Sequence, residues 1–177
     1  MYHTYRCVLD IKEDVIRDIK IDASLSLQDL HKAIKNAFRF SSNEMAAFYR
    51  TDETWEQGEE IPLVDMNDAG EPNEMKDHLL KDSFHEKKDK MLYVYDFFNL
   101  WTFYIELEEI DKTENLETPV QLLFTKGELP HEAPEKQFES DKKETNDYLD
   151  DFEGEFDSEF GEDFDDDINI EDLENIY

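Results

Sequence analysis

Two side chains in this sequence could carry acid–base chemistry. Asp96 stands between Tyr95 and Phe97 in the most apolar and aromatic stretch of the chain, Met91–Leu107. A carboxylate buried among aromatic rings has a raised pKa and can donate or accept a proton. His31 is the second candidate, because it borders the apolar stripe of a predicted helix. Each has a structural alternative, since aspartate is also favoured in turns, where it accepts backbone hydrogen bonds, and histidine also packs at the rim of a core.

Other catalytic and cofactor motifs are missing from the sequence. The histidines are scattered, no His/Cys pair has zinc spacing, and no acidic loop has the calcium-binding pattern. There is also no glycine-rich phosphate loop, no Gly-x-Ser-x-Gly turn and no recognisable Cys/His nucleophile pair. We therefore expect no metal site and no cofactor. The enzyme hypothesis depends on Asp96 with His31.

The C-terminal segment carries regularly spaced aromatic residues between acids. From residue 144 to residue 177 there are 16 acidic residues and no basic one. Such a segment buries too little apolar surface to offset its ordering entropy, so we expect residues 139–177 to be disordered when free. A purely solubilising tail is one interpretation. The other is a set of anchors for a basic partner, namely Tyr148, Phe152, Phe156, Phe160, Phe164 and Leu173.

The net charge of −30 limits the possible partners. Residues 139–177 hold 18 acids and two lysines, and residues 1–138 hold 30 acids and 16 bases, so both parts are acidic. A field of this sign repels phosphate backbones and attracts basic proteins and cations, so we expect no direct nucleic-acid binding. No apolar run approaches the ~20 residues of a membrane helix, and the N-terminus has no signal-peptide pattern. We therefore also expect no membrane association and a cytoplasmic location.

The candidate side chains Asp96 and His31 would be positioned by an α+β domain over residues 1–138. Apolar residues at helical spacing predict one long helix at Leu27–Phe38, with Ser26 and Asp29 as a capping box. The single cysteine, Cys7, lies in a predicted strand and is expected to be a buried apolar residue. A short edge element around Ile61–Met66 and a short helix at 75–85 are also expected. Runs of strand formers predict strands at 3–11, 15–21, 44–50, 91–95, 101–107 and 120–124.

The predicted elements fit one architecture. Alternating apolar and polar residues indicate strands with one face on a core and one in water, as in antiparallel sheets. We expect a mostly antiparallel sheet covered by one main helix, with a β-grasp-like order. The acidic segment 139–177 would form a separate, disordered tail.

The helix and the central aromatic stretch resemble a known family. Ser26-Leu27-x-x-Leu30-His31-x-Ala33-Ile34, followed by Phe48 and by Tyr95-Asp96-Phe97-x-x-x-Trp101, is similar to the plasmid pRiA ORF-3-like family, which includes transposon passenger or TnpR-like proteins. The resemblance covers residues 3–125 and is closest to a subgroup that ends in an acidic tail. It implies a small α+β domain, an association with mobile elements and no established activity.

The sequence departs from the usual motif of this family, which runs Tyr-Asp-Phe-Gly-Asp-x-Trp-x-His, at several positions. If the polar positions of this motif form a site in relatives, only Asp96, His31 and Trp101 of that site persist in this sequence, and the loss of the others argues against an inherited catalytic or metal role. The recombinase that the passenger name suggests would need a nucleophile among arginines and a basic DNA-binding region, and the chain has neither. The departures are Phe98 for glycine, Asn99 for the second acid, Phe103 for histidine, Glu44 for another histidine and Ile16 for tryptophan.

We interpret the chain as a non-enzymatic protein-interaction module. Its domain would present a binding surface at Trp55, Asp96 and Trp101, near His31, and its acidic tail would bind or shield a basic partner. One alternative is an enzyme, or a degenerate relative of one, that uses Asp96 with His31 as acid and base. Another is a tail that masks a basic groove of its own domain.

Overall fold

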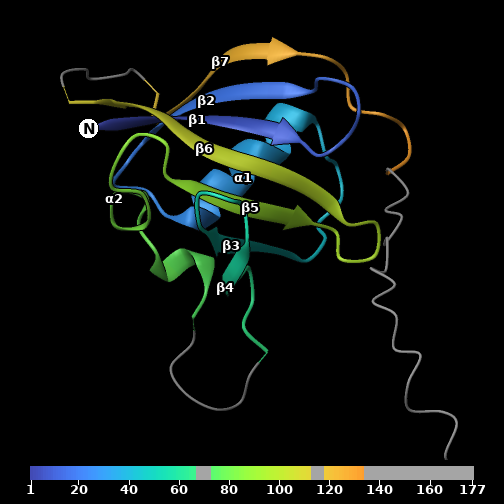
Figure 1. The fold of residues 1–177 in the computed structure, drawn as a ribbon, viewed down its shortest axis with the longest axis horizontal. Coiled ribbons are helices and arrows are strands. Elements are labelled where there is room, and N and C mark those ends of the chain that lie inside the picture. The colour runs from blue at the N-terminus through green and yellow to red at the C-terminus, as the bar shows by residue number, and fades with distance from the viewer. Residues whose placement is uncertain (67–72, 113–117, 134–177) are drawn as a thin grey trace, which may run out of the picture. The chain divides into compact units, whose positions relative to one another are not determined.

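The computed structural model describes residues 1–66, 73–112 and 118–133 (Figure 1). These residues form a seven-stranded sheet with the order β4-β3-β5-β6-β1-β2-β7. Every strand pair in this sheet is antiparallel. The mostly antiparallel sheet that we expected is therefore confirmed. The predicted tail, residues 139–177, and its aromatic anchors lie outside the described residues.

The aromatic hairpin lies near the middle of the sheet. β5 (Lys90–Tyr95) and β6 (Trp101–Asp111) pair from Lys90 opposite Glu106 to Tyr95 opposite Trp101. Side chains alternate along a strand, so one residue parity of each strand faces the core. The buried apolar residues of the pair are Met91, Tyr93, Tyr95, Trp101, Phe103, Ile105 and Leu107. The two adjacent buried strands predicted for Met91–Leu107 are thus confirmed.

Two groups of strands extend the sheet on either side of this hairpin. β1 (Tyr2–Leu9), β2 (Ile16–Asp22) and β7 (Val120–Lys126) lie on the β6 side, and β3 (Ala46–Thr51) and β4 (Gln57–Pro62) lie on the β5 side. Cys7, in β1, is fully buried, as predicted. Burial raises the pKa of its thiol, which makes it a packing residue rather than a reactive one.

The helix α1 (Leu27–Phe38) has the predicted limits. Ser26 Oγ accepts a hydrogen bond from the Asp29 backbone N–H at 3.3 Å, and Asp29 Oδ2 accepts one from the Ser26 N–H at 3.1 Å. This reciprocal pair is a capping box, which satisfies two N–H groups that the first turn leaves without helical partners. The apolar stripe of the helix packs on one face of the sheet, where the Phe38 and Phe103 rings lie 4.7 Å apart.

The prediction of one short helix at residues 75–85 is wrong. The structure has a 3-10 turn, η1 (Met75–Asp77), and a one-turn helix, α2 (Leu80–Ser83), with His78 and Leu79 extended between them. The extended residues are held by the segment before α1, because the Leu27 N–H donates to the His78 carbonyl at 2.9 Å and Leu79 forms an isolated bridge with Ser26. With these further short elements present, neither a single main helix nor the β-grasp-like order is confirmed.

The edge element expected around Ile61–Met66 starts earlier and ends earlier, as β4. Ile61 is buried opposite Phe48 of β3, and the strand stops at Pro62, which has no N–H to donate. Val64 and Met66 therefore lie beyond the strand and are exposed.

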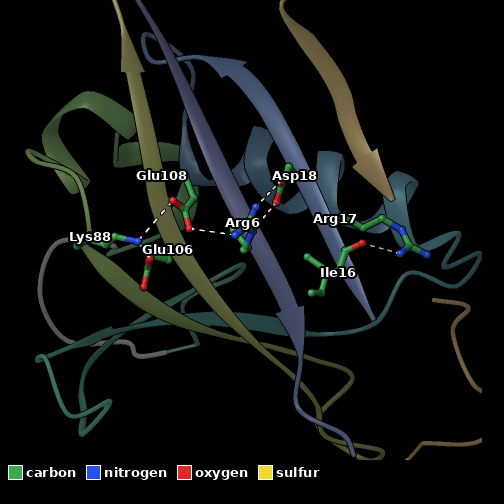
Figure 2. Close-up of polar contacts among 7 residues, drawn as sticks. All are labelled: Arg6, Ile16, Arg17, Asp18, Lys88, Glu106 and Glu108. Carbon is green, nitrogen blue, oxygen red and sulfur yellow. Dashed lines mark hydrogen bonds and ion pairs between the residues drawn. The ribbon is translucent and has the colours of Figure 1, made fainter. Parts of the chain in front are cut away.

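Arg17 joins β2, β7 and the end of α1, a role that the strand pattern does not indicate. It is almost fully buried, and its guanidinium lies 4.8 Å from the Phe38 ring centroid. Figure 2 shows its bond to the Ile16 carbonyl. Its N–H groups donate to the backbone carbonyls of Ile16 (2.8 Å), Ala37 (3.1 Å), Lys126 (2.8 Å) and Gly127 (3.1 Å).

Candidate functional site

The loop between β5 and β6 is built around the Asp96 side chain. Its carboxylate accepts hydrogen bonds from the Phe98 N–H (3.1 Å), the Asn99 N–H (3.2 Å) and the Asn99 side-chain amide (2.6 Å). Its backbone N–H donates to the Met45 carbonyl at 2.8 Å, and its carbonyl accepts from the Leu100 N–H at 2.6 Å. Asp96 has φ 60°, a left-handed conformation that aspartate and asparagine adopt more readily than most residues. The Asp96 residue is half-buried in this turn. The structure therefore gives Asp96 the turn role that was its structural alternative.

His31 lies in a different environment, on the sheet-facing side of α1. Its side chain is 5% exposed, and its Nδ1 lies 2.7 Å from the hydroxyl of Tyr93. Burial, with smaller contributions from Lys35 and Lys32, lowers the His31 pKa to about 4. The imidazole is consequently neutral at physiological pH, which makes it a poor proton donor there.

Asp96 and His31 do not share a site. His31 lines a depression of about 420 Å³ beside α1, which we call the His31 depression; its lining residues are Gln28, His31, Lys32, Lys35, Asn36, Asn43 and Leu63. Asp96 is not among them. In the part of the chain that the structure describes, the Asp96 carboxylate bonds its own turn and His31 bonds Tyr93, so the two side chains are not hydrogen-bonded to each other as an acid–base pair.

The predicted surface residues Trp55 and Trp101 lie on opposite faces of the sheet. Trp101 is 7% exposed and packs against the Phe40 ring at 5.4 Å on the α1 face. Trp55 packs against Tyr104 at 4.8 Å, with Lys90 Nζ 5.0 Å from its ring. Because Trp101 and Tyr104 are three residues apart on one strand, they face opposite sides. Trp55, Asp96 and Trp101 thus do not form one surface.

A second depression, which strand and helix patterns do not reveal, lies beside the Asp96 turn. We call it the Phe97 depression; it has a volume of about 260 Å³ and is lined by Met45, Glu60, Pro62, Val64, Asp65, Met66, Asn73 and Phe97. Met66 is 82% exposed, and Phe98, the residue after Phe97, is 94% exposed. Exposed apolar side chains beside carboxylates suit a partner that offers both apolar and basic groups. The feature of the sequence that could have indicated this depression is a set of apolar residues whose positions fit neither the alternation of a strand nor the spacing of a helix.

The outer face of the sheet carries a row of ion pairs (Figure 2). Lys88 on the β5 side contacts Glu106 and Glu108 of β6, Glu108 contacts Arg6 of β1, and Arg6 contacts Asp18 of β2. The bidentate Arg6–Asp18 pair has both distances at 2.9 Å. Ion pairs in contact with water add little to stability, so the row is a solvated surface whose charges largely compensate one another.

The part of the chain that the structure describes has neither a cluster of metal-binding side chains nor a helix that could span a membrane. Residues 1–66, 73–112 and 118–133 contain no group of three His, Cys, Asp or Glu side chains placed to hold a metal ion. None of the helices described in those ranges has both the length and the apolar character needed to span a bilayer.

A family model described as "Plasmid pRiA4b ORF-3-like protein" matches residues 7–172. The chain belongs to this family. The match extends past residue 125, where the motif resemblance ended, into the acidic segment. No curated protein matches the chain.

Among solved structures, the pRiA4b ORF-3-like chain is similar to a crystal structure of a protein of unknown function from Methanosarcina mazei Go1. The two are 23% identical with a TM-score of 0.55, and the match covers 70% of this chain and 68% of the other. An identity this low shows a shared fold alone.

The pRiA4b ORF-3-like motif residues of this chain have mostly structural positions. Tyr95 and Trp101 are core residues opposite each other, and Asp96 holds the turn between them. Phe98 is not among the residues with positive φ, so the turn does not need the glycine of the usual family motif there. Replacing that glycine with phenylalanine instead adds an exposed aromatic ring beside the Phe97 depression.

Proposed function

We propose that this chain is a non-enzymatic protein-interaction module that binds or shields a basic protein. The observation that carries the proposal is the distribution of acids. The described residues hold 25 acidic and 15 basic side chains, a balance of −10, and the remaining residues bring the net charge to −30. Charge of one sign on both the domain and the C-terminal segment attracts a partner of the opposite sign over long distances.

The Phe97 depression is the proposed contact surface of the domain. It replaces the sequence-based surface of Trp55, Asp96 and Trp101, whose members are separated. Val64, Met66 and Phe97 offer apolar contact area, while Glu60 and Asp65 provide carboxylates at the rim. Glu60 also bonds Tyr49, and Asp65 accepts from the Asn73 N–H at 3.2 Å, so the two acids are held in place. The group on a partner that would complement this surface is an apolar side chain flanked by lysine or arginine.

The C-terminal segment supplies the greater charge. Residues 144–177 contain 16 acids, no base and the spaced aromatics Tyr148 to Phe164. In the proposal, the acids give long-range attraction and the aromatic residues give short-range contacts.

The proposal includes the narrower family assignment. The chain would act in the cytoplasm as a transposon passenger, TnpR-like protein of the acidic-tail subgroup, associated with mobile elements. Membership of the pRiA4b ORF-3-like family supports this context through the plasmid origin in the family's description.

A comparison of protein capture by matched full-length variants tests the function. One variant replaces the 16 acids of residues 144–177 by their amides, a second replaces Phe152, Phe156, Phe160 and Phe164 by alanine, and a third carries Met66→Ser with Phe97→Ser. We expect the wild type to capture basic proteins from lysate, the amide variant to lose most of them, and the other two to recover less. Capture of the same basic proteins in the same amounts by the wild type and the amide variant would remove the acidic segment from the mechanism.

A further inference from the structure

The His31 depression has the size and position of a ligand site. Five of its lining residues lie on one face of α1, because they are separated by three or four positions: Gln28, His31, Lys32, Lys35 and Asn36. Asn43 and Leu63, from the segments that precede β3 and follow β4, complete the lining. The volume of about 420 Å³ falls within the range of roughly 300–1,000 Å³ of small-molecule pockets.

The hydrogen bond to Tyr93 sets the tautomer of His31. Tyr93 is fully buried and its pKa is raised well above the ordinary value, mainly by burial, so its hydroxyl keeps its proton. That proton needs an acceptor, and in the described part of the chain the partner of this hydroxyl is His31 Nδ1, at 2.7 Å. Nδ1 therefore accepts, and the neutral ring carries its own proton on Nε2.

The Nε2–H group of His31 is available to a ligand. Within residues 1–66, 73–112 and 118–133, no hydrogen bond is formed by Nε2. In the described residues, two side-chain polar atoms are inaccessible to solvent and also lack a hydrogen-bond partner: Thr51 Oγ1 and Ser83 Oγ. His31 Nε2 is not one of them, so this nitrogen is accessible to solvent. A side chain that is 5% exposed, with one nitrogen bonded inward to Tyr93, reaches solvent through its other nitrogen, into the depression that it lines.

The charge of the lining residues is opposite to that of the molecule. Two lysines and no acid line the depression, although the described residues have a balance of −10. Lys32 is paired with Asp29 at 3.1 Å, so Lys35 is the stronger cation at the site. Lys35 Nζ donates to Asn43 Oδ1 at 2.7 Å and lies 5.9 Å from the Tyr95 ring, which holds it at the wall of the depression.

From this arrangement we propose that the His31 depression binds a small carboxylate. One carboxylate oxygen accepts from His31 Nε2–H and the other from the Lys35 ammonium, as in the charge-assisted hydrogen bonds common in anion sites. The carboxamides of Gln28 and Asn36 offer further donors and acceptors, and Leu63 provides an apolar wall for a short hydrocarbon chain. The site differs from the Phe97 depression in its residues and in the sign of its charge.

A titration monitored at His31 tests this site in the full-length protein. Sodium succinate is added at constant ionic strength, and the Nε2 resonance is followed in long-range ¹H–¹⁵N NMR spectra. We expect a saturable shift that Lys35→Gln weakens at least about tenfold, the effect of losing one charge-assisted hydrogen bond. Lys12→Gln, which removes an exposed lysine that does not line the depression, is the matched control and should leave the affinity unchanged.

A further arm of the titration identifies the class of the anion. Inorganic phosphate should bind more weakly than succinate. The proposal is overturned by the lack of a saturable shift, by equal affinities of Lys35→Gln and Lys12→Gln, or by phosphate binding as tightly as succinate.

Discussion

At the scale of single residues, the two side chains whose types suggest acid–base chemistry, Asp96 and His31, both form hydrogen bonds that stabilise the fold. The Asp96 carboxylate accepts three hydrogen bonds within its own turn, and the His31 imidazole is bonded to a buried tyrosine. Both structural alternatives could be stated from the sequence, because aspartate favours turns and His31 borders an apolar stripe. The choice between them could not, because it depends on which residues lie beside each group in space.

Substitution of Asp96 separates a turn role from an acid–base role. Asp96→Asn keeps an oxygen that accepts from the Phe98 and Asn99 N–H groups, and asparagine tolerates φ 60°, so we expect a stability change below about 0.5 kcal/mol. Asp96→Ala loses these bonds and strains the left-handed backbone, so we expect a loss of about 2 kcal/mol. Urea unfolding measures both. Equal losses in the two variants would contradict the turn role.

Burial of neutral His31 makes stability depend on pH. Its pKa is about 4 in the folded protein against 6.5 for an ordinary histidine, so between these values the unfolded state binds more protons. The stabilisation from His31 is complete above pH 6.5 and is lost as the pH falls toward 4. Between pH 7 and pH 5, we expect the wild type to lose about 2 kcal/mol relative to His31→Gln. Urea unfolding of both proteins at the two pH values gives this difference, and parallel pH profiles would contradict it.

At the scale of elements, local patterns predicted the helix and the paired strands well. The limits of α1 follow from a capping box and an apolar stripe that are both visible in the sequence. The β5–β6 hairpin follows from two apolar runs around a polar break. The segment at 75–85 was predicted wrongly because its extended middle is fixed by hydrogen bonds to residues far away in the sequence. Arg17 likewise has a role that depends on carbonyls contributed by β2, β7 and α1.

The end of β7 offers a test of how the outer strand is attached. Gly127 has φ +70°, and a Cβ there would lie 2.3 Å from the Asp14 carbonyl oxygen, so Gly127→Ala must displace the backbone beside Arg17. We expect it to cost at least about 2 kcal/mol. Gly58→Ala is the control, because its nearest contact is 3.1 Å and its φ lies outside the left-handed region. Thermal unfolding compares the two, and an equal or smaller loss for Gly127→Ala would show that β7 is not held in this way.

At the scale of the whole molecule, charge and exposed apolar groups decide the proposed function. Composition alone predicts an attraction to basic partners, since the acid excess is a property of the sequence, and that attraction stays a prediction. Composition does not indicate where the proposed contact surface lies. The Phe97 depression combines the turn after β5 with the segments after β4 and before η1, and these meet only in the folded chain.

The most direct test of this account is photo-crosslinking from the proposed contact surface. A benzophenone amino acid replaces Phe98, beside the Phe97 depression, or Leu123, an exposed apolar residue of β7 that serves as control. We expect the probe at position 98 to capture a basic protein from lysate, with a yield that falls when salt rises from about 0.1 M to about 1 M and the Debye length shrinks from about 10 Å to about 3 Å. The probe at position 123 should capture little of the same protein. Equal capture from both positions, or capture at position 98 of a partner that is not basic, would contradict the account.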